Sequence, residues 1–196
     1  MSEVAPGLVT VFGGSGFVGS QVVHALARRG WRIRIACRRP DRAYKLQTSG
    51  SVGQIQAIRC DVTDAAQVAE AVRGADAVIN LVGILYESGA RTFEALHVGA
   101  SRKIAEACAA AGVDRLVQVS ALGANPESES DYARTKAEAE MAVREVKPDA
   151  VILRPSVVFG PGDDFLNKFA GMAQIAPVLP LIGGGQTKFQ PVYVGD

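Results

Sequence analysis

The stretch LVTVF (8–12), followed at once by GGSGFVG (13–19), decides the fold of this 196-residue chain. LVTVF is a short apolar run rich in β-branched residues, which is typical of a buried strand, and it stops at the glycines. Beyond them Val18, Val22 and Leu26 form an apolar stripe at helical spacing. This stretch is therefore predicted to form a strand, a tight glycine turn and a helix.

Similar patterns recur along the chain. Further strands are predicted at 31–37, 55–58, 77–82, 116–119 and 151–153, and helices at 64–73, 93–111 and 133–146. Alternation of this kind indicates a parallel sheet covered on both faces, because each crossover must return over the sheet. We predict an α/β fold with a doubly wound parallel sheet over residues 1–154.

The amino-acid composition of the sequence changes after Arg154. Glycine and proline become dense, so long regular elements are less expected there. We assign 155–196 to a second, Gly/Pro-rich substrate region. Because the sequence stops directly after the strand-like FQPVYV (189–194), we expect that region to be partial.

Composition excludes several classes of protein. With 48% hydrophobic and 21% charged residues the chain falls in the ordinary globular range, and no apolar run reaches the length of a membrane span. No secretory signal is visible, so a cytoplasmic location is predicted. A net charge of +1 argues against nucleic acid as a partner. Residues 1–60 are nevertheless basic, which suits RNA, an anionic membrane surface or a small phosphorylated ligand.

The cysteines and histidines indicate neither a disulfide framework nor a metal centre. Cys37, Cys60 and Cys108 are widely spaced and form no C-x-x-C motif, so buried thiols are expected. His24 and His97 are the only histidines, and together with scattered cysteines they predict no transition-metal site.

The G-x-x-G-x-x-G spacing of residues 13–19 suits a diphosphate. The turn must be tight, an anion must approach the backbone without meeting a Cβ, and the helix N-terminus offers free N–H groups. A flexible turn is the alternative, but the surrounding alternation of strands and helices favours a dinucleotide. The predicted contacts here are Gly13, Ser15, Gly16, Phe17, Val18 and Gly19.

The end of the second strand bears on the choice of cofactor. A carboxylate there would bind the adenosine ribose of NAD, but none precedes Asp41. NADP(H) is therefore favoured over NAD, with Arg38 the first and Arg39 the second candidate for its extra phosphate, unless both merely solvate a loop. Asp61 and Val62 are expected to border the adenine, although Asp61 suits helix capping equally well.

Tyr132 and Lys136 lie four residues apart, so on a helix their side chains share one face. A nearby ammonium group and a positive nicotinamide ring favour the phenolate and lower the pKa of tyrosine from about 10. Tyr132 is predicted to be a general acid or base at a carbonyl or hydroxyl, while Lys136 holds the nicotinamide ribose. The Y-x-x-x-K pattern alone is common by chance.

These motifs do not stand alone. Together with NLVG (80–83), VSALGA (119–124) and LRPSVVFGPGD (153–163), they make the chain resemble an atypical or extended short-chain dehydrogenase/reductase of the NAD(P)-dependent epimerase/dehydratase superfamily. It is most similar there to bacterial relatives of the NADPH-binding accessory subunit of respiratory complex I. The resemblance implies a Rossmann fold and places Ser120 in the active-site serine region. It also implies cofactor contacts at Asn80, Leu81, Val82, Gly83, Pro155, Ser156, Val157 and Val158.

Some residues depart from the family pattern or suggest a structural role. Ser120 is the only hydroxyl of its segment, which implies weaker polarisation of a substrate carbonyl. His97 stands where many relatives have asparagine, and we expect it to be packed or half-exposed rather than a proton relay. Asp163 and Asp164 follow a glycine in a turn and are expected to be solvated or to cap a helix.

The resemblance implies an NADP(H)-binding protein tied to quinone or respiratory redox metabolism, peripheral to a membrane respiratory complex and the inner membrane. The alternative is an active NAD(P)-dependent oxidoreductase or nucleotide-sugar epimerase/dehydratase that uses the Tyr and Lys pair on a small-molecule substrate. A weaker alternative is an NADP(H)-sensing regulator. Related enzymes often dimerise through the helices at 93–111 and 133–146, so a homodimer is a further expectation.

Overall fold

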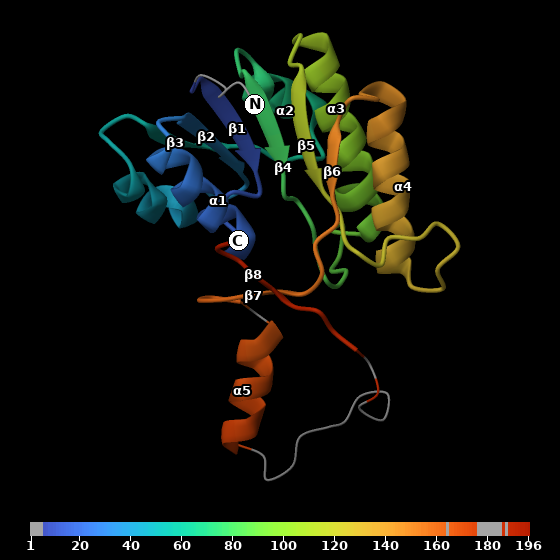
Figure 1. The fold of residues 1–196 in the computed structure, drawn as a ribbon. Helices are drawn as coiled ribbons and strands as arrows, with labels where there is room; N and C mark the ends of the chain where they lie inside the picture. Colours follow the sequence, from blue (N-terminus) through green and yellow to red (C-terminus); the bar gives the residue numbers. More distant parts are fainter. Residues whose placement is uncertain (1–5, 164, 176–185, 187) are drawn as a thin grey trace. The chain divides into compact units, whose positions relative to one another are not determined.

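The computed structural model describes residues 6–163, 165–175, 186 and 188–196. The chain divides into two compact units, Met1–Arg154 and Pro155–Asp196. The larger unit is a sheet with helices on both faces (Figure 1). Its elements are β1 (Leu8–Phe12), α1 (Phe17–Arg28), β2 (Arg32–Cys37), η1 (Pro40–Ser49), β3 (Ile55–Arg59), α2 (Ala65–Val72), β4 (Ala77–Asn80), η2 (Glu94–Gly99), α3 (Ala100–Ala110), β5 (Arg115–Val119), α4 (Asp131–Val146) and β6 (Val151–Leu153).

The six strands are all parallel, in the order β3-β2-β1-β4-β5-β6. From β1 the chain first builds outward through β2 to β3, then returns to place β4 on the other side of β1. The strand order therefore reverses between β1 and β4. In open α/β sheets ligands bind outside the carboxyl ends of the strands at such a point. The predicted doubly wound sheet is confirmed.

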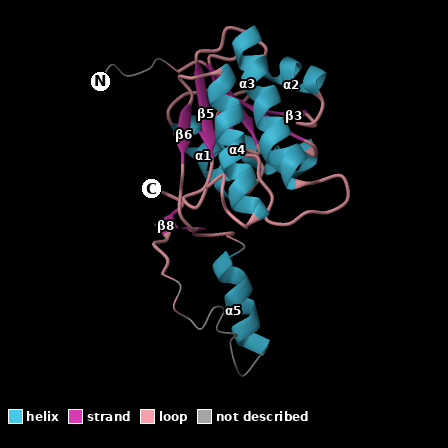
Figure 2. Cartoon of the chain, turned by 90° about the vertical axis from the view of Figure 1, so that its right-hand side faces the viewer, coloured by secondary structure: helices cyan, strands magenta, loops and turns pink. Residues whose placement is uncertain are grey.

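Two apolar clusters hold the layers together. On one face α1 and η1 cover β1, β2 and β3, with Val23 and Leu46 buried against Ile33 and Ile35. On the other face lie α2, α3 and α4, which Figure 2 shows from their outer side. Each apolar side chain that is fully buried in these layers stabilises the fold by roughly 1.5–3 kcal/mol.

Helix α1 packs differently from its predicted stripe. Its buried residues are Gly19, Val23 and Ala27, one position after the three expected apolar residues, which are only half-buried. The shift follows from the turn, because Gly19 lies directly against the glycine loop and sets the rotation of the helix. The glycine therefore marks the buried face better than the larger side chains do.

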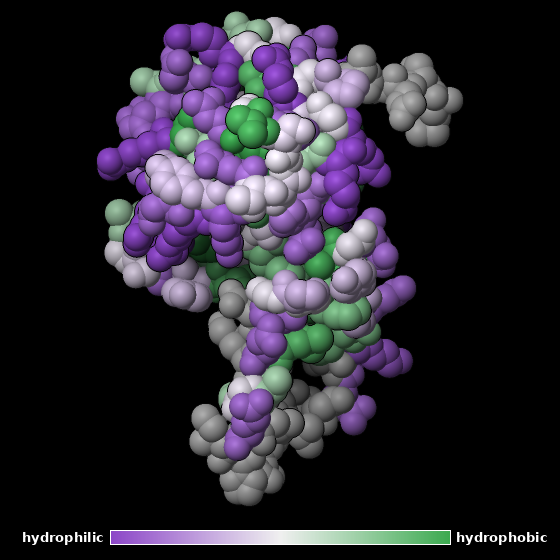
Figure 3. Space-filling model, turned by 90° about the vertical axis from the view of Figure 1, so that its left-hand side faces the viewer, coloured by the Kyte–Doolittle hydropathy of each residue, from purple (hydrophilic) through white to green (hydrophobic). Residues whose placement is uncertain are grey.

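One short helix was not predicted, and one predicted helix has an unexpected type at its start. Pro40–Ser49 forms a 3₁₀ helix, and its buried residues Ala43 and Leu46 are three apart, as that helix requires. Its other side chains are mostly exposed and polar, and the hydrophilic surface beside β3 is visible in Figure 3. The expected helix 93–111 begins instead with the π-helical turn Glu94–Gly99, after which α3 is regular.

The smaller unit contains β7 (Val158–Phe159), α5 (Phe165–Ile175) and β8 (Val192–Tyr193), with β7 and β8 paired in parallel. Helix α5, of 11 residues, lies in the stretch where long regular elements were less expected. Most of the glycines and prolines lie outside it, and the Asp163 carboxylate accepts a 2.6 Å hydrogen bond from the Leu166 N–H. Capping by Asp163 is thus confirmed, while Asp164 lies outside the described residues.

None of the helices in the described part of the chain combines the length and apolar character needed to span a bilayer. All three cysteines are free. Cys60 and Cys108 are buried as expected, whereas Cys37 is partly exposed. Among residues 6–163, 165–175, 186 and 188–196, no three His, Cys, Asp or Glu side chains cluster as metal ligands would.

Candidate functional site

The glycine loop joins β1 to α1 at the point where the strand order reverses. Gly13 has a φ of +77°, in the left-handed region that favours glycine, and its carbonyl accepts a 3.0 Å hydrogen bond from the Gly16 N–H. Gly16 is the N-cap of α1, and no side chain caps the helix there. The first N–H groups of α1 are consequently available to an anion.

Close packing explains why the loop needs glycine. A Cβ on Gly19 would lie 2.3 Å from the Gly13 carbonyl oxygen, and one on Gly13 would lie 3.0 Å from the Leu81 carbonyl. The helix N-terminus can therefore lie directly on the turn and on the end of β4. A diphosphate fits this arrangement, because the backbone is bare and no side chain caps the first N–H groups of α1.

A cavity of about 530 Å³ opens beside the loop, within the size range of small-molecule sites. Nine of the predicted cofactor contacts line it: Gly13, Ser15, Gly16, Arg38, Arg39, Val62, Leu81, Val82 and Gly83. Seven further lining residues were not predicted: Ala36, Cys37, Arg42, Cys60, Ile84, Arg91 and Leu96. The cavity thus follows the carboxyl ends of β1 to β4.

Other predicted contacts lie outside this lining. Phe17, Val18 and Gly19 form the first turn of α1, behind the loop. Asp61 accepts hydrogen bonds of 3.0 and 2.8 Å from the Thr63 N–H and hydroxyl. Those bonds lower the pKa of its carboxyl group. Pro155, Ser156, Val157 and Val158 belong to the smaller unit, at β7 and just before it.

The capping role left open for Asp61 belongs to Asp64. That side chain accepts bonds from the Ala66 and Gln67 N–H groups at the start of α2. Asp61 lies one turn earlier and closes a turn on Thr63 instead. An aspartate directly before the helical stretch is the better N-cap, because its carboxylate reaches the N2 and N3 donors.

Asn80 is fully buried at the end of β4. Its amide nitrogen donates to Gln118 Oε1 at 2.8 Å and to Ser101 Oγ at 3.2 Å, while its Oδ1 accepts from the Val82 N–H at 3.0 Å. These bonds tie β4 to β5 and α3. Asn80 therefore shapes the backbone at 81–83 that lines the cavity, without lining the cavity itself.

One wall of the cavity is strongly basic. Arg38, Arg39 and Arg42 line it from the end of β2 and the start of η1, and no lining residue carries a carboxylate. Asp41 pairs with Arg39 at 3.1 Å, and that hydrogen bond lowers the pKa of the Asp41 carboxyl. Both partners are well exposed, so the pair is weak and leaves Arg39 available to another anion.

On α4, Lys136 is buried at 4% exposure, and its Nζ donates a 2.8 Å hydrogen bond to the Val119 carbonyl at the end of β5. Burial lowers the pKa of Lys136 to about 8, while the Glu140 charge acts in the opposite direction. A lysine in this state holds a proton near neutral pH and can release it readily.

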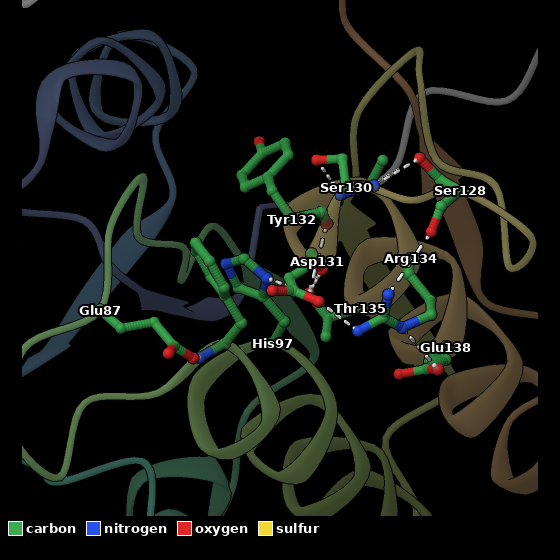
Figure 4. Close-up of polar contacts among 11 residues, drawn as sticks. Glu87, His97, Ser128, Ser130, Asp131, Tyr132, Arg134, Thr135 and Glu138 are labelled. Carbon is green, nitrogen blue, oxygen red and sulfur yellow. Dashed lines mark hydrogen bonds and ion pairs between the residues drawn. The ribbon is translucent and has the colours of Figure 1, made fainter.

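For Tyr132 the sequence predicted a pKa lowered by the lysine and by a nicotinamide ring. The phenol is half-buried, and burial raises its pKa. The Lys136 ammonium donates to the Val119 carbonyl, and among the described residues no hydrogen bond joins it to the phenol. Figure 4 shows the Tyr132 ring edge-on to His97, with centroids 5.4 Å apart, and its hydroxyl directed away from that histidine.

His97 is packed, as expected, with 1% exposure. Its Nε2 accepts from the Ile84 N–H at 3.2 Å, so Nδ1 carries the proton and donates to Thr135 Oγ1 at 3.0 Å. Burial and the Lys136 charge lower the pKa of His97 to about 4. The neutral ring thereby links the loop after β4 to the first turns of α4.

Ser120 follows β5 and is buried at 5% exposure. Its Oγ has no hydrogen bond of ordinary geometry to any described residue, although the hydroxyl is near enough to help lower the pKa of Glu140. Glu140 itself is held by Arg154, with N–O distances of 2.8 and 2.5 Å. Ser120 therefore keeps a buried hydroxyl that a ligand can use.

Comparisons with known proteins agree with this geometry. A family model described as NAD(P)H-binding matches residues 13–162. Mouse NADH dehydrogenase [ubiquinone] 1 alpha subcomplex subunit 9, mitochondrial, is 40% identical over 198 residues, which cover all of this chain and 52% of that protein. Ceramide reductase of Caulobacter vibrioides is 33% identical, over 93% of this chain and 56% of that protein. The chain thus spans about half the length of these curated relatives.

Solved structures agree on the fold. MoeE5 in complex with UDP-glucose and NAD superposes with a TM-score of 0.76 at 23% identity, over 95% of this chain and 67% of that one. At this identity the match supports the Rossmann architecture alone. From the family match and the relatives, the chain belongs to the NAD(P)H-binding family, as an atypical short-chain dehydrogenase/reductase related to the complex I accessory subunit.

Proposed function

We propose that this protein holds NADP(H) in the cavity beside the glycine loop and works in quinone or respiratory redox metabolism. The diphosphate lies on the start of α1, and the extra phosphate of the adenosine half lies against Arg38 and Arg39. When bound, the dinucleotide supplies hydride chemistry. The chain itself supplies binding, orientation and charge.

The observation that carries the cofactor choice is the basic wall. Arg38, Arg39 and Arg42 meet at the end of β2, where a carboxylate would have to stand to bind the ribose hydroxyls of NAD. Asp41, the first acidic residue after β2, pairs with Arg39 and is not part of the lining. Guanidinium groups bind phosphate through paired, charge-assisted hydrogen bonds.

Two measurements test the proposal. Mass spectrometry of the nucleotide released on denaturing the freshly purified protein should identify NADP(H). Calorimetry on the protein stripped of nucleotide should then give a stronger affinity for NADPH than for NADH. Release of no nucleotide, together with no binding of either coenzyme, contradicts the proposal.

Arg38→Ala should weaken NADPH binding by roughly 10- to 100-fold and leave NADH binding nearly unchanged, because only NADPH carries the adenosine phosphate. Arg29→Ala is the matched control, since it removes the same charge at the far end of α1, about 18 Å from the glycine loop. An equal loss for both coenzymes would show that Arg38 does not bind the extra phosphate.

A second candidate function is catalysis by Tyr132 and Lys136. Two observations favour it: burial lowers the pKa of Lys136 to about 8, and the buried Ser120 hydroxyl forms no hydrogen bond of ordinary geometry to any described residue. One relative is named ceramide reductase, and an enzyme among the relatives supports a catalytic function. In this reading Tyr132 gives a proton to a substrate oxygen, or takes one from it, and Lys136 supports the exchange.

Tyr132→Phe separates the two functions. Dinucleotide affinity should stay within about twofold of wild type, because the phenol hydroxyl is not needed to hold the nucleotide, whereas proton transfer at a carbonyl should be lost. NADPH oxidation is followed by absorbance with a panel of carbonyl compounds and nucleotide sugars. If wild type and variant turn over equally, Tyr132 has no part in proton transfer.

The respiratory setting rests on the relatives, among them the mouse subunit of NADH dehydrogenase [ubiquinone]. We propose a peripheral association with a membrane respiratory complex on the cytoplasmic side. Native electrophoresis of gently solubilised membranes, probed for the tagged full-length protein, should place it with a large quinone-reducing assembly. Migration only as a free monomer or homodimer would contradict that association.

A further inference from the structure

The segment between β4 and η2 carries a feature that the proposed function does not use. Residues 84–92, called here the β4 loop, fold back on themselves through two 3.1 Å backbone hydrogen bonds between Ser88 and Arg91. Gly89 makes the turn possible with a φ of +57°. The loop is thus a defined hairpin-like turn.

Both ends of the β4 loop are anchored in the first unit. At its start the Ile84 N–H donates to His97 Nε2 at 3.2 Å, and just past its end the Phe93 N–H donates to Glu87 Oε1 at 2.6 Å. Anchored in this way, the loop presents Arg91 to the same cavity as the glycine loop. Because Arg91 is exposed and lines the cavity, its guanidinium group can bind a ligand there.

The four arginines of the cavity come from two sides. Arg38, Arg39 and Arg42 follow β2, whereas Arg91 follows β4, and β1 with its glycine loop lies between those strands. Arg39 has Asp41 as an ion-pair partner, but Arg91 forms no ion pair with any residue that the structure describes. The adenosine phosphate needs only the β2 side. The charge on the β4 side is therefore available to a different anionic group of the ligand.

We propose that Arg91 binds the dinucleotide diphosphate from the β4 side, opposite the N-terminus of α1. This inference rests on the proposed function, because it takes the ligand to be a nicotinamide dinucleotide. The helix start offers backbone N–H groups from one side, and Arg91 closes the site from the other with a charge-assisted pair of hydrogen bonds. Arg91 thereby sets affinity for the shared diphosphate, while Arg38 sets the preference for NADP(H).

The test is the affinity of stripped protein for NADPH and NADH, measured by calorimetry. Arg91→Ala should weaken both by about tenfold or more and leave their ratio unchanged, since both contain the diphosphate. Arg91→Lys keeps the charge and loses the paired geometry, so its loss should be smaller. Arg38→Ala, by contrast, should change the ratio.

The bonds to Ser88 use main-chain atoms, so replacing the Arg91 side chain leaves the loop closed. Thermal unfolding of the variant checks this, and Arg29→Ala again controls for the loss of one positive charge. Unchanged affinity for both coenzymes overturns the inference, and so does a loss confined to NADPH, which would place Arg91 at the adenosine phosphate. If wild type itself binds neither coenzyme, the proposed function fails first and this inference falls with it.

Discussion

Replacing Gly19 with alanine should abolish dinucleotide binding. The new Cβ would lie 2.3 Å from the Gly13 carbonyl oxygen and 2.7 Å from the Gly14 Cα, and both are backbone atoms that cannot rotate away. The N-terminus of α1 would have to move off the glycine loop, which removes the N–H groups from the diphosphate. We expect affinity to fall by at least about 100-fold and stability by about 1–3 kcal/mol, the usual cost of overpacking.

Gly99→Ala is a matched control for this prediction. Gly99 also lies in a helical segment, but a Cβ there would meet its nearest atoms, Glu94 O and Lys103 Nζ, at 3.6 Å, an ordinary contact distance. That variant should bind nucleotide normally and gain up to about 1 kcal/mol from better helix propensity. Calorimetry and denaturant unfolding measure both quantities. If Gly19→Ala binds like wild type, close approach of α1 is not required.

The fold could be predicted because its signals are local. The glycine run between LVTVF (8–12) and the α1 stretch, and the alternation of strands with helices, each depend on neighbouring residues. Where a signal needed tertiary context, prediction failed. The rotation of α1 follows from the contact of Gly19 with the turn, and helix α5 from an Asp163 cap in a stretch flanked by glycines and prolines.

The site was predictable in part for the same reason. Arg38 and Arg39 follow a strand whose end is visible in the sequence, but Arg91 reaches the cavity only because β4 lies beside β1. The role of Asn80 was also hidden, since Gln118 and Ser101 are distant along the chain. Spacing correctly put Tyr132 and Lys136 on one helix. It could not show that the Lys136 ammonium would bind the Val119 carbonyl and leave burial to raise the pKa of Tyr132.

Acid should destabilise this protein through His97. Its pKa is lowered from 6.5 to about 4 in the folded state, so between these values the unfolded chain binds a proton that the folded chain does not. The stabilising contribution is complete above pH 6.5 and is lost as the pH falls towards 4. The difference corresponds to about 3 kcal/mol. Denaturant unfolding of wild type across this range should show the loss, in addition to that from carboxylates.

His97→Gln isolates this contribution. Glutamine has one acceptor and one donor that can serve Ile84 N–H and Thr135 Oγ1 without titrating, so its stability between pH 6.5 and 4 should fall by about 3 kcal/mol less than that of wild type. His24→Gln, which replaces the other histidine, on α1, is the control for the loss of a histidine. Equal slopes in all three proteins would mean that His97 does not titrate in this range.

Protonation of His97 should also lower the affinity of the cavity for nucleotide. A proton on Nε2 removes the acceptor for the Ile84 N–H and leaves two donors facing each other at the start of the β4 loop. That loop supplies Arg91 to the cavity, whereas Arg38 is held by β2 and does not depend on His97. As the pH approaches 4, the pKa of His97 in the folded protein, the wild-type protein should therefore lose affinity for NADPH and NADH together, and His97→Gln should lose less. A loss of affinity for NADPH alone would instead indicate titration of the adenosine phosphate itself. It would mean that protonation of His97 does not affect nucleotide binding.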